Sequence, residues 1–358
     1  MRTQRMSKRL SQALADEAEI ENQHAVVTLA AAMDRSRHDE IEAALDADRE
    51  TLMERLSLDE PPGRITRDGD AWDDAVSQLA DTGEESMADA MAEKVETLRE
   101  RAERPYPSLL RLRFKPEEPF EFVPGQYARI SYEEEDPRVY SIASSPNDDE
   151  LELCIRRVPG GHLTPDLCDR TEEGDEVFVR GPYGDEFLLQ DPSERDLVFI
   201  ATGTGAAPFK SMIDYTFEEG LDEFESDKRD IWLFLGASWK DDLPYREEFL
   251  DLADEHENFH LVLTCSREEY LCDWDGETEY VQHTLLKYLD TEYVDADTLP
   301  QEVAEFIGSE PATDIDARLD PNSAEVYVCG IGAMCESVRE VIEPLGVSEM
   351  YYEEESYG

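Results

Sequence analysis

The hydrophobic pattern of the chain changes its period near Pro192, and this change separates two kinds of fold. Before it, from about residue 92, apolar and polar residues alternate within short runs that Gly, Pro and Asp separate. After it, apolar runs alternate with stretches of helical spacing. Closely spaced short strands without helices predict a small antiparallel barrel. Alternation of strand and helix predicts a doubly wound parallel sheet.

Four runs of each kind carry this prediction. The alternating runs are LLRLRFK at 109–115, YARISY at 127–132, ELELCIRRV at 150–158 and DEVFVRG at 175–181. The buried runs are LVFIA at 197–201, DIWLFLG at 230–236, FHLVLT at 259–264 and EVYVCG at 325–330. The fold class is therefore β followed by α/β.

Residues 1 to about 58 are predicted to be helical. Apolar residues recur at helical spacing from Ile41 to Leu56, and Pro61-Pro62-Gly63 ends the pattern. The following acidic stretch is predicted as a linker with a short helix. This extension is either a small helical appendage or a module that docks a partner. The predicted domains are a helical acidic extension with linker at 1–90, a barrel at 91–191 and an α/β domain at 192–358.

The charge of the chain excludes some partners. It has 88 Asp and Glu against 33 Lys and Arg, a formal net charge of −55. Such a chain repels nucleic-acid phosphates and anionic membrane surfaces. It also repels itself unless salt screens the charges. The composition favours a halophilic protein over a merely acidic one, and it predicts neither nucleic acid nor membrane as a partner.

The cysteines do not indicate a metal or a disulfide framework. The six, at positions 154, 168, 265, 272, 329 and 335, form no CxxC pair and no iron–sulfur spacing. No apolar signal segment follows the basic start. We expect a cytoplasmic protein with reduced thiols. HENFH at 256–260 matches the HExxH pattern of zinc proteases, but its histidines are predicted on different elements, so no metal is expected.

A glycine-rich turn is the strongest local motif. ATGTGAAPF at 201–209 follows a buried strand and precedes a helix. Gly203 and Gly205 would let the backbone approach a pyrophosphate at the helix N-terminus. Pro208 replaces the third glycine of a standard dinucleotide fingerprint. The motif alone fits an ordinary βα turn equally well.

The glycine-rich turn is one of several motifs that follow one another along the chain, and together they favour a dinucleotide site over an ordinary βα turn. They are RVYS at 138–141, GHLT at 161–164, GPYG at 181–184, GTGAAP at 203–208, CSRE at 265–268, YVQ at 280–282 and VCGIGAM at 328–334. In this order they resemble the ferredoxin–NADP(H) reductase family, particularly its plant-type branch. The resemblance covers about residues 92–358. It implies a barrel that binds FAD and an α/β domain that binds NADP(H).

The resemblance assigns FAD contacts within the barrel. Arg138 is expected on the FAD pyrophosphate, Tyr140 on the isoalloxazine ring and Ser141 near its N5 atom. The Thr164 hydroxyl and the amides of residues 162–164 are expected on the pyrophosphate. The remaining expected FAD contacts are Val139, Cys154, Ile155, Arg156, His162 and Leu163.

The resemblance also assigns contacts to the second cofactor. Ser266 and Arg267 are expected to read the 2′-phosphate of NADP(H), and Tyr280 to stack on its adenine beside Gln282. Thr204 is expected near both cofactors, and Cys329 with Gly330 beside the nicotinamide. At the C-terminus, Tyr357 is expected to cover the flavin, and Glu355 to hold the carboxamide or relay a proton near Ser141.

The expected function is electron transfer between NADP(H) and a one-electron protein carrier, most simply ferredoxin. Two alternatives remain at this stage. One is the reductase component of an oxygenase that uses a separate iron–sulfur carrier, and the other is a non-catalytic interaction subunit that retains the fold. The cationic row Arg111, Arg113 and Lys115 is expected either to meet an acidic carrier or to be a solvated face of the barrel.

Overall fold

A computed structural model describes residues 22–65, 71–132, 136–271, 274–294 and 296–357. The chain forms two compact units. The first, here called the two-domain unit, comprises Met1–Asp34, Leu109–Ser266 and Asp275–Gly358. The second, here called the helical unit, comprises Arg35–Ser108 and Arg267–Trp274.

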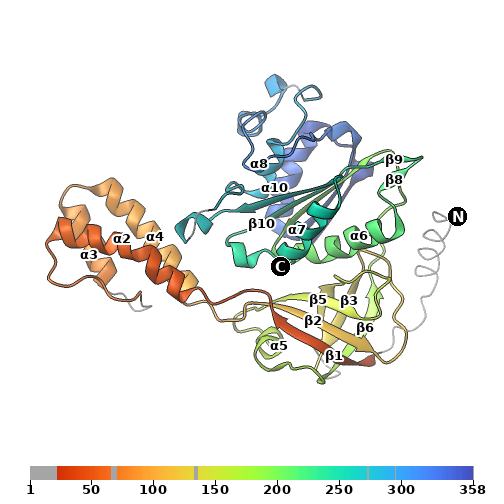
Figure 1. Cartoon of the computed structure of the whole chain (residues 1–358), viewed down its shortest axis with the longest axis horizontal. Helices are drawn as coiled ribbons and strands as arrows, with labels where there is room; N and C mark the ends of the chain where they lie inside the picture. Colours follow the sequence, from red (N-terminus) through yellow and green to blue (C-terminus); the bar gives the residue numbers. More distant parts are fainter. Residues whose placement is uncertain (1–21, 66–70, 133–135, 272–273, 295, 358) are drawn as a thin grey trace. The chain divides into compact units, whose positions relative to one another are not determined.

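Six antiparallel strands form the first domain of the two-domain unit (Figure 1). Their spatial order is β4-β3-β6-β1-β2-β5. The strands are β1 Gln23–Ala32, β2 Leu109–Pro116, β3 Tyr127–Ser131, β4 Arg138–Ser141, β5 Leu151–Arg156 and β6 Glu176–Tyr183. Alternate residues of β2, Leu110, Leu112 and Phe114, are buried in its core. The predicted antiparallel domain is confirmed.

The predicted N-terminal helix is wrong at residues 23–32, because this segment is strand β1. The part of that prediction on residues 1–21 lies outside the described residues. It lies between β2 and β6, and its register with β2 runs from Ala25–Pro116 to Ala32–Leu110. Ala25 and Val27 are buried and Val26 is exposed, which is the period of a strand. Pairing with two neighbours outweighs the helical preference of its alanines.

In the sequence, the helices that follow β1 therefore come between two strands of the barrel rather than before its first strand. They are α2 His38–Leu56, α3 Ala71–Asp81 and α4 Glu85–Ala102. The predicted spacing in α2 is confirmed, since Ile41, Leu45 and Leu52 are buried. Two helices stand where the sequence predicted a linker with one short helix. Trp72 of α3 is fully buried, and its indole nitrogen donates to the carbonyl of Gly63 at 2.9 Å.

Five parallel strands form the second domain, in the order β11-β10-β7-β12-β13. They are β7 Asp196–Thr202, β10 Ile231–Ala237, β11 Phe259–Cys265, β12 Ala324–Ile331 and β13 Tyr352–Tyr357. Helices α6 Ala206–Glu219 and α7 Arg246–Glu255 cover one face, and α8 Val281–Leu286 and α10 Gly332–Ile342 the other (Figure 1). The doubly wound sheet is confirmed. The strand order reverses between β7 and β12, where open α/β sheets bind ligands.

The smaller elements complete the description. They are α5 Thr164–Arg170, α9 Gln301–Ala304, and a short hairpin of β8 Glu223–Phe224 with β9 Asp227–Lys228. Within the described ranges, none of the helices combines the length and the apolar character that a membrane span requires.

Candidate functional site

The glycine turn after β7 lies against the end of β12. A Cβ atom at Gly205 would lie 2.1 Å from the carbonyl oxygen of Cys329, which no side chain can accommodate. A Cβ at Gly330 would lie 2.6 Å from the Thr202 hydroxyl oxygen. Gly203 adopts φ +52°, which glycine accepts without strain. The glycines therefore bring the ends of the two central strands into direct contact at the switch point.

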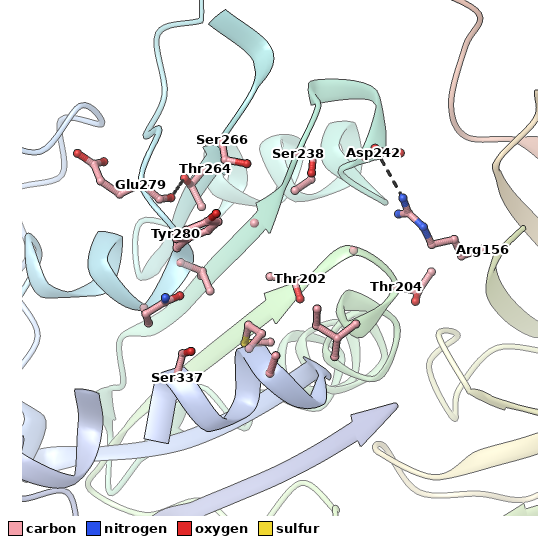
Figure 2. A pocket seen from close by; sticks show the side chains of 18 of the residues that line it. Arg156, Thr202, Thr204, Ser238, Asp242, Thr264, Ser266, Glu279, Tyr280 and Ser337 are labelled. Carbon is pink, nitrogen blue, oxygen red and sulfur yellow. Dashed lines mark hydrogen bonds and ion pairs between the residues drawn. The ribbon is translucent and has the colours of Figure 1, made fainter. Parts of the chain in front are cut away.

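A cavity of about 540 Å³, here called the switch-point cavity, opens above this turn. Figure 2 shows Ser266, Thr264 and Tyr280 on one side of it and Thr204 and Arg156 on the other. Its lining includes the predicted residues Gly203, Thr204, Ser266, Tyr280 and Gln282. Tyr280 is largely exposed, so its ring face can receive a planar base.

Several residues that line this cavity are not among the site residues predicted from the sequence. Ser238 and Asp242 follow β10, and Ser337 lies on α10. Their position after or beside the carboxyl ends of parallel strands, where such sheets bind ligands, could have indicated them from the sequence. Asp242 lies 3.9 Å from the guanidinium of Arg156, so this carboxylate holds a side chain that comes from the barrel.

Cys329, predicted beside the nicotinamide, and Pro208, predicted in the glycine-rich turn, do not line the cavity. Cys329 is fully buried, and its carbonyl packs against Gly205. Burial raises the pKa of the Cys329 thiol, so it stays protonated and is not a nucleophile. Pro208 is buried in the first turn of α6. These residues shape the backbone of the site.

Arg267 and its neighbour Ser266 belong to different units of the chain. The structure groups it with the helical unit, where its guanidinium lies 3.5 Å from the carboxylate of Glu100 on α4. Both side chains are largely exposed. Ser266 remains in the two-domain unit, where its amide donates to the carbonyl of Ala237 at 3.1 Å.

A second cavity, of about 560 Å³ and here called the barrel cavity, lies beside strands β4 and β5. The predicted residues among its lining are Arg138, Val139, Tyr140, Ser141, Cys154, Arg156, His162, Leu163, Thr164, Thr204, Glu355 and Tyr357. Ile155 does not line it, because alternate side chains of β5 face opposite sides. Cys154 and Arg156 face the cavity, and the Ile155 side chain is buried in the barrel core.

The barrel cavity offers donors for an anion and a wall for a ring. The guanidinium of Arg138 is partly exposed and touches only backbone carbonyls at 3.3–3.4 Å and the Asp136 carboxylate at 3.7 Å among the described residues. Thr164 accepts a hydrogen bond from the amide of Val158 at 2.8 Å, which leaves its own hydroxyl hydrogen to donate. Burial raises the pKa of Tyr140, so its phenol stays neutral.

The C-terminal segment is strand β13 rather than a frayed tail. It pairs in parallel with β12, which places Glu355 opposite Cys329 and Tyr357 opposite Ile331. The Tyr357 hydroxyl donates to the carbonyl of Thr202 at 2.8 Å and accepts from the amide of Gly205 at 2.8 Å. Tyr357 is thereby anchored across the glycine turn.

The two cavities meet at three residues. Arg156, Thr204 and Tyr357 line both of them. Burial raises the pKa of Glu355 beside this point, and a hydrogen bond with Ser141 opposes the shift. A ring bound in one cavity and a ring bound in the other would face the same tyrosine.

The HENFH residues lie apart, as predicted. Helix α7 ends at Glu255, and β11 begins at Phe259. The ring of His256 stacks on Phe217 at 3.8 Å between centroids, and that of His260 lies 3.0 Å from the Asp230 carboxylate. Across the described residues, no group of three or more His, Cys, Asp or Glu side chains is arranged to hold a metal ion.

The cationic row is paired with carboxylates. Arg111 lies 2.8 Å from Glu152 and 2.6 Å from Glu248, and Arg113 also pairs with Glu152. Burial would raise the pKa of Glu152, but hydrogen bonds from both arginines outweigh it and hold the pKa below its usual value. Arg111 and Arg113 therefore already have carboxylate partners within the fold. Docking of an acidic carrier on this row stays a prediction.

Comparison with known proteins agrees with this geometry. The oxidoreductase FAD-binding domain matches residues 106–187, and the oxidoreductase NAD-binding domain matches residues 199–340. The chain carries an oxidoreductase FAD-binding domain followed by an oxidoreductase NAD-binding domain. The barrel is thus an FAD-binding domain, and the parallel-sheet domain binds NAD(P).

The curated relatives of the chain differ in their names. The ferredoxin–NAD(P)(+) reductase component of the naphthalene 1,2-dioxygenase system of Pseudomonas putida is 34% identical over 154 residues, 43% of this chain and 45% of the relative. Chloroplastic ferredoxin–NADP reductase, leaf isozyme 1, of Arabidopsis thaliana is 27% identical over 226 residues, 59% of this chain and 56% of the relative. The chain spans about half the length of the curated relatives it matches.

A solved structure has the same fold. The ferredoxin–NADP+ reductase of Neisseria gonorrhoeae with bound FAD and NADP superposes with a TM-score of 0.54 at 20% identity, over 70% of this chain and 93% of that chain. This likeness shows the fold. The assignment of individual residues to cofactors rests on the cavities of this chain.

Proposed function

We propose that this chain passes electrons between NADP(H) and a one-electron protein carrier, most simply ferredoxin, with FAD in the barrel cavity. The observation that carries the proposal is the meeting of the two cavities at Arg156, Thr204 and Tyr357. FAD, when bound, accepts two electrons as hydride at N5 and releases them singly. The chain's residues bind, orient and shield the reacting rings.

Residues of the barrel are proposed to hold FAD. Arg138 pairs with the pyrophosphate, because a guanidinium fork matches phosphate oxygens. The amides of His162, Leu163 and Thr164, with the Thr164 hydroxyl, bind the same group. Tyr140 lies along the isoalloxazine, while Val139, Cys154, Arg156 and the backbone of Ile155 complete the contacts. The proposed FAD-binding domain is β1 together with residues 109–191.

Residues 192–357 are proposed to bind NADP(H). Gly203 and Gly205 admit the pyrophosphate to the start of α6. Ser266 and Arg267 read the 2′-phosphate, and Tyr280 beside Gln282 stacks on the adenine. Preference for NADPH over NADH follows from these contacts.

The C-terminal residues are proposed to control the nicotinamide end. Tyr357 covers the flavin and moves aside so that the nicotinamide can stack there. Glu355 and Ser141, which share a hydrogen bond, hold or move a proton near N5. Cys329 and Gly330 shape the wall behind them.

A second candidate function is the reductase component of an oxygenase system. The Pseudomonas putida relative, at 34% identity, carries that name. Both functions use the same site and differ in the carrier, which for the second candidate is the iron–sulfur partner of an oxygenase.

The acidic composition supports a proposed setting in a salty cytoplasm. A formal net charge of −55 is tolerated when salt shortens the screening length to about 3 Å at 1 M. A halophilic member of the family is the proposal that this charge supports.

The test is a visible spectrum of the purified protein followed by an NADPH-driven cytochrome c assay. The proposal expects flavin bands and a cytochrome c reduction rate that rises on addition of ferredoxin. A rate that rises only with an oxygenase's iron–sulfur carrier favours the second candidate. A protein that binds no added FAD is an interaction subunit and contradicts both.

A further inference from the structure

The connection between β10 and α7, residues 238–245, contacts the barrel at two separate places. Both the connection and the barrel strands that it contacts belong to the two-domain unit. In its first part, Ser238 and Asp242 line the switch-point cavity, and the Asp242 carboxylate lies 3.9 Å from the guanidinium of Arg156 on β5 (Figure 2). At its end, Tyr245 precedes α7 and is only 1% exposed.

The second contact is centred on Arg111 of β2. Its Nη1 donates to Oε1 of Glu248 on α7 at 2.6 Å, and its Nε lies 2.8 Å from Oε2 of Glu152 on β5. The guanidinium carbon also lies 5.5 Å from the centroid of the Tyr245 ring, which is within the range of a cation–π contact. Arg111 therefore joins two strands of the barrel to the start of α7.

This contact lies on the face of the barrel that carries the barrel cavity. Arg111 pairs in register with Cys154 on β5, and opposite residues of an antiparallel pair project from the same face. Cys154 lines the barrel cavity. Arg113 is two residues further along β2 and also pairs with Glu152, but that pair lies within the barrel. Arg111 and Arg113 therefore share a strand and a carboxylate, and they differ in the contact that Arg111 makes with α7.

Tyr245 is also held from within the parallel-sheet domain. The ammonium nitrogen of Lys210 on α6 lies 5.3 Å from the centroid of the Tyr245 ring. Helix α6 starts directly after the glycine turn, at Ala206. Tyr245 adopts φ +57°, a left-handed conformation that a bulky residue rarely adopts. Such backbone conformations persist where the surrounding contacts determine them, and they cluster at functional sites.

We propose that Arg111, Glu248 and Tyr245 are positioning residues that align the switch-point cavity with the barrel cavity for hydride transfer. In the described part of the chain, none of the three is among the residues that line these cavities. Their contacts fix the distance and angle between the domains that carry them. Hydride transfer needs reacting atoms about 3–3.5 Å apart, so a small displacement slows the step without weakening the binding of either ring. This inference rests on the proposed function.

The test is rapid mixing of the full, FAD-loaded chain with excess NADPH, without a protein carrier. Glu248→Gln removes the charge from the contact between α7 and Arg111, and it should lower the limiting rate of flavin reduction by at least about threefold. The dissociation constant for NADP+ should change by less than about twofold, because Glu248 does not line the cavity. The charge-transfer band of the complex between nicotinamide and flavin should weaken.

Hydrogen exchange reports on the same contact independently of the reaction. The amide of Phe249 donates to the Tyr245 carbonyl at 3.0 Å, in the first turn of α7. Its exchange should accelerate in Glu248→Gln, because the start of this helix loses its attachment to the barrel. Unchanged exchange overturns the inference.

The matched control is Glu247→Gln. This carboxylate precedes Glu248 on α7 and pairs with its neighbour Arg246. The control should change the limiting rate by less than about twofold. Equal rates in Glu247→Gln and Glu248→Gln overturn the inference, and so does a loss that appears in NADP+ affinity rather than in the rate.

A second comparison uses the two arginines of β2. Arg111→Gln should lower the limiting rate by at least about tenfold, whereas Arg113→Gln should change it by less than about twofold. Adding Glu248→Gln to Arg111→Gln should cause no further loss, because both changes remove the same contact. Equal effects of the two arginine variants overturn the inference. If either arginine variant does not fold, the two glutamate variants decide, since both carboxylates are partly exposed.

The same experiment separates this inference from the proposed function. If NADPH does not reduce the flavin of the unmodified chain, the proposed function fails. If the unmodified chain is reduced, and Glu248→Gln and Arg111→Gln match their controls in rate, only the inference about the positioning residues fails.

Discussion

Replacing Tyr357 by Phe tests the proposal that its ring covers the flavin and that its hydroxyl anchors the ring there. The hydroxyl makes two 2.8 Å hydrogen bonds, to the Thr202 carbonyl and from the Gly205 amide. A neutral hydrogen bond contributes about 0.5–1.5 kcal/mol net, so the two together stabilise the observed position of the Tyr357 ring by about 1–3 kcal/mol. Each 1.4 kcal/mol is about tenfold in affinity, and the dissociation constant for NADP+ should fall by about 5- to 150-fold in Tyr357→Phe.

The assay is a difference-spectrum titration of the FAD-loaded protein with NADP+. Tyr352→Phe is the matched control, since it removes a tyrosine hydroxyl from the same strand whose partner is Glu354, at 2.8 Å. The control should change the dissociation constant by less than about twofold. An unchanged or weaker affinity in Tyr357→Phe would refute the argument that the tyrosine must leave its two hydrogen bonds before nicotinamide stacks.

Three further predictions concern stability and are each checked by thermal unfolding. Gly205→Ala should lower the free energy of unfolding by at least about 1–3 kcal/mol, because its Cβ would meet the Cys329 carbonyl at 2.1 Å. Gly332→Ala, with open space around it, should change the free energy of unfolding by less than about 0.5 kcal/mol. Equal losses in the two variants would contradict this prediction. Burial raises the pKa of Asp196 to about 6, so the folded state binds the carboxyl proton more tightly than the unfolded state does. The unfolding temperature of the unmodified chain should therefore fall, relative to that of Asp196→Asn, as the pH rises from about 4 through 6. A pH-independent difference would remove that argument. With a formal charge of −55, the unfolding temperature should rise steeply between about 0.1 and 1 M KCl, and a flat profile would count against salt adaptation.

Local periodicity predicts most of this fold, and it fails where pairing partners are distant. Residues 109–115 alternate clearly enough to predict β2. Strand β1 contains QHAVVTLAAA, whose alanines suit a helix, and its strand character depends on β2 and β6, more than 75 residues away. That the helices are an insertion within the barrel is a property of topology, which no short window of sequence contains.

The candidate site likewise contains residues that the sequence could predict and residues that it could not. Gly203 and Gly205 were predictable because their backbone requirements are local. The carboxylate partners of cationic residues were not: Glu100 precedes Arg267 by 167 residues, and Glu248 follows Arg111 by 137. Sequence identifies cations, whereas the fold decides which of them are already neutralised.

The most direct test is an anaerobic absorbance titration of the FAD-loaded protein, first with NADPH and then with oxidised ferredoxin. The account predicts that NADPH bleaches the flavin bands and that they return as ferredoxin is reduced, with about two ferredoxins consumed per NADPH, because a hydride carries two electrons. Flavin bands that remain unchanged in excess NADPH would contradict the central claim that the two cavities bring the dinucleotide and the flavin together.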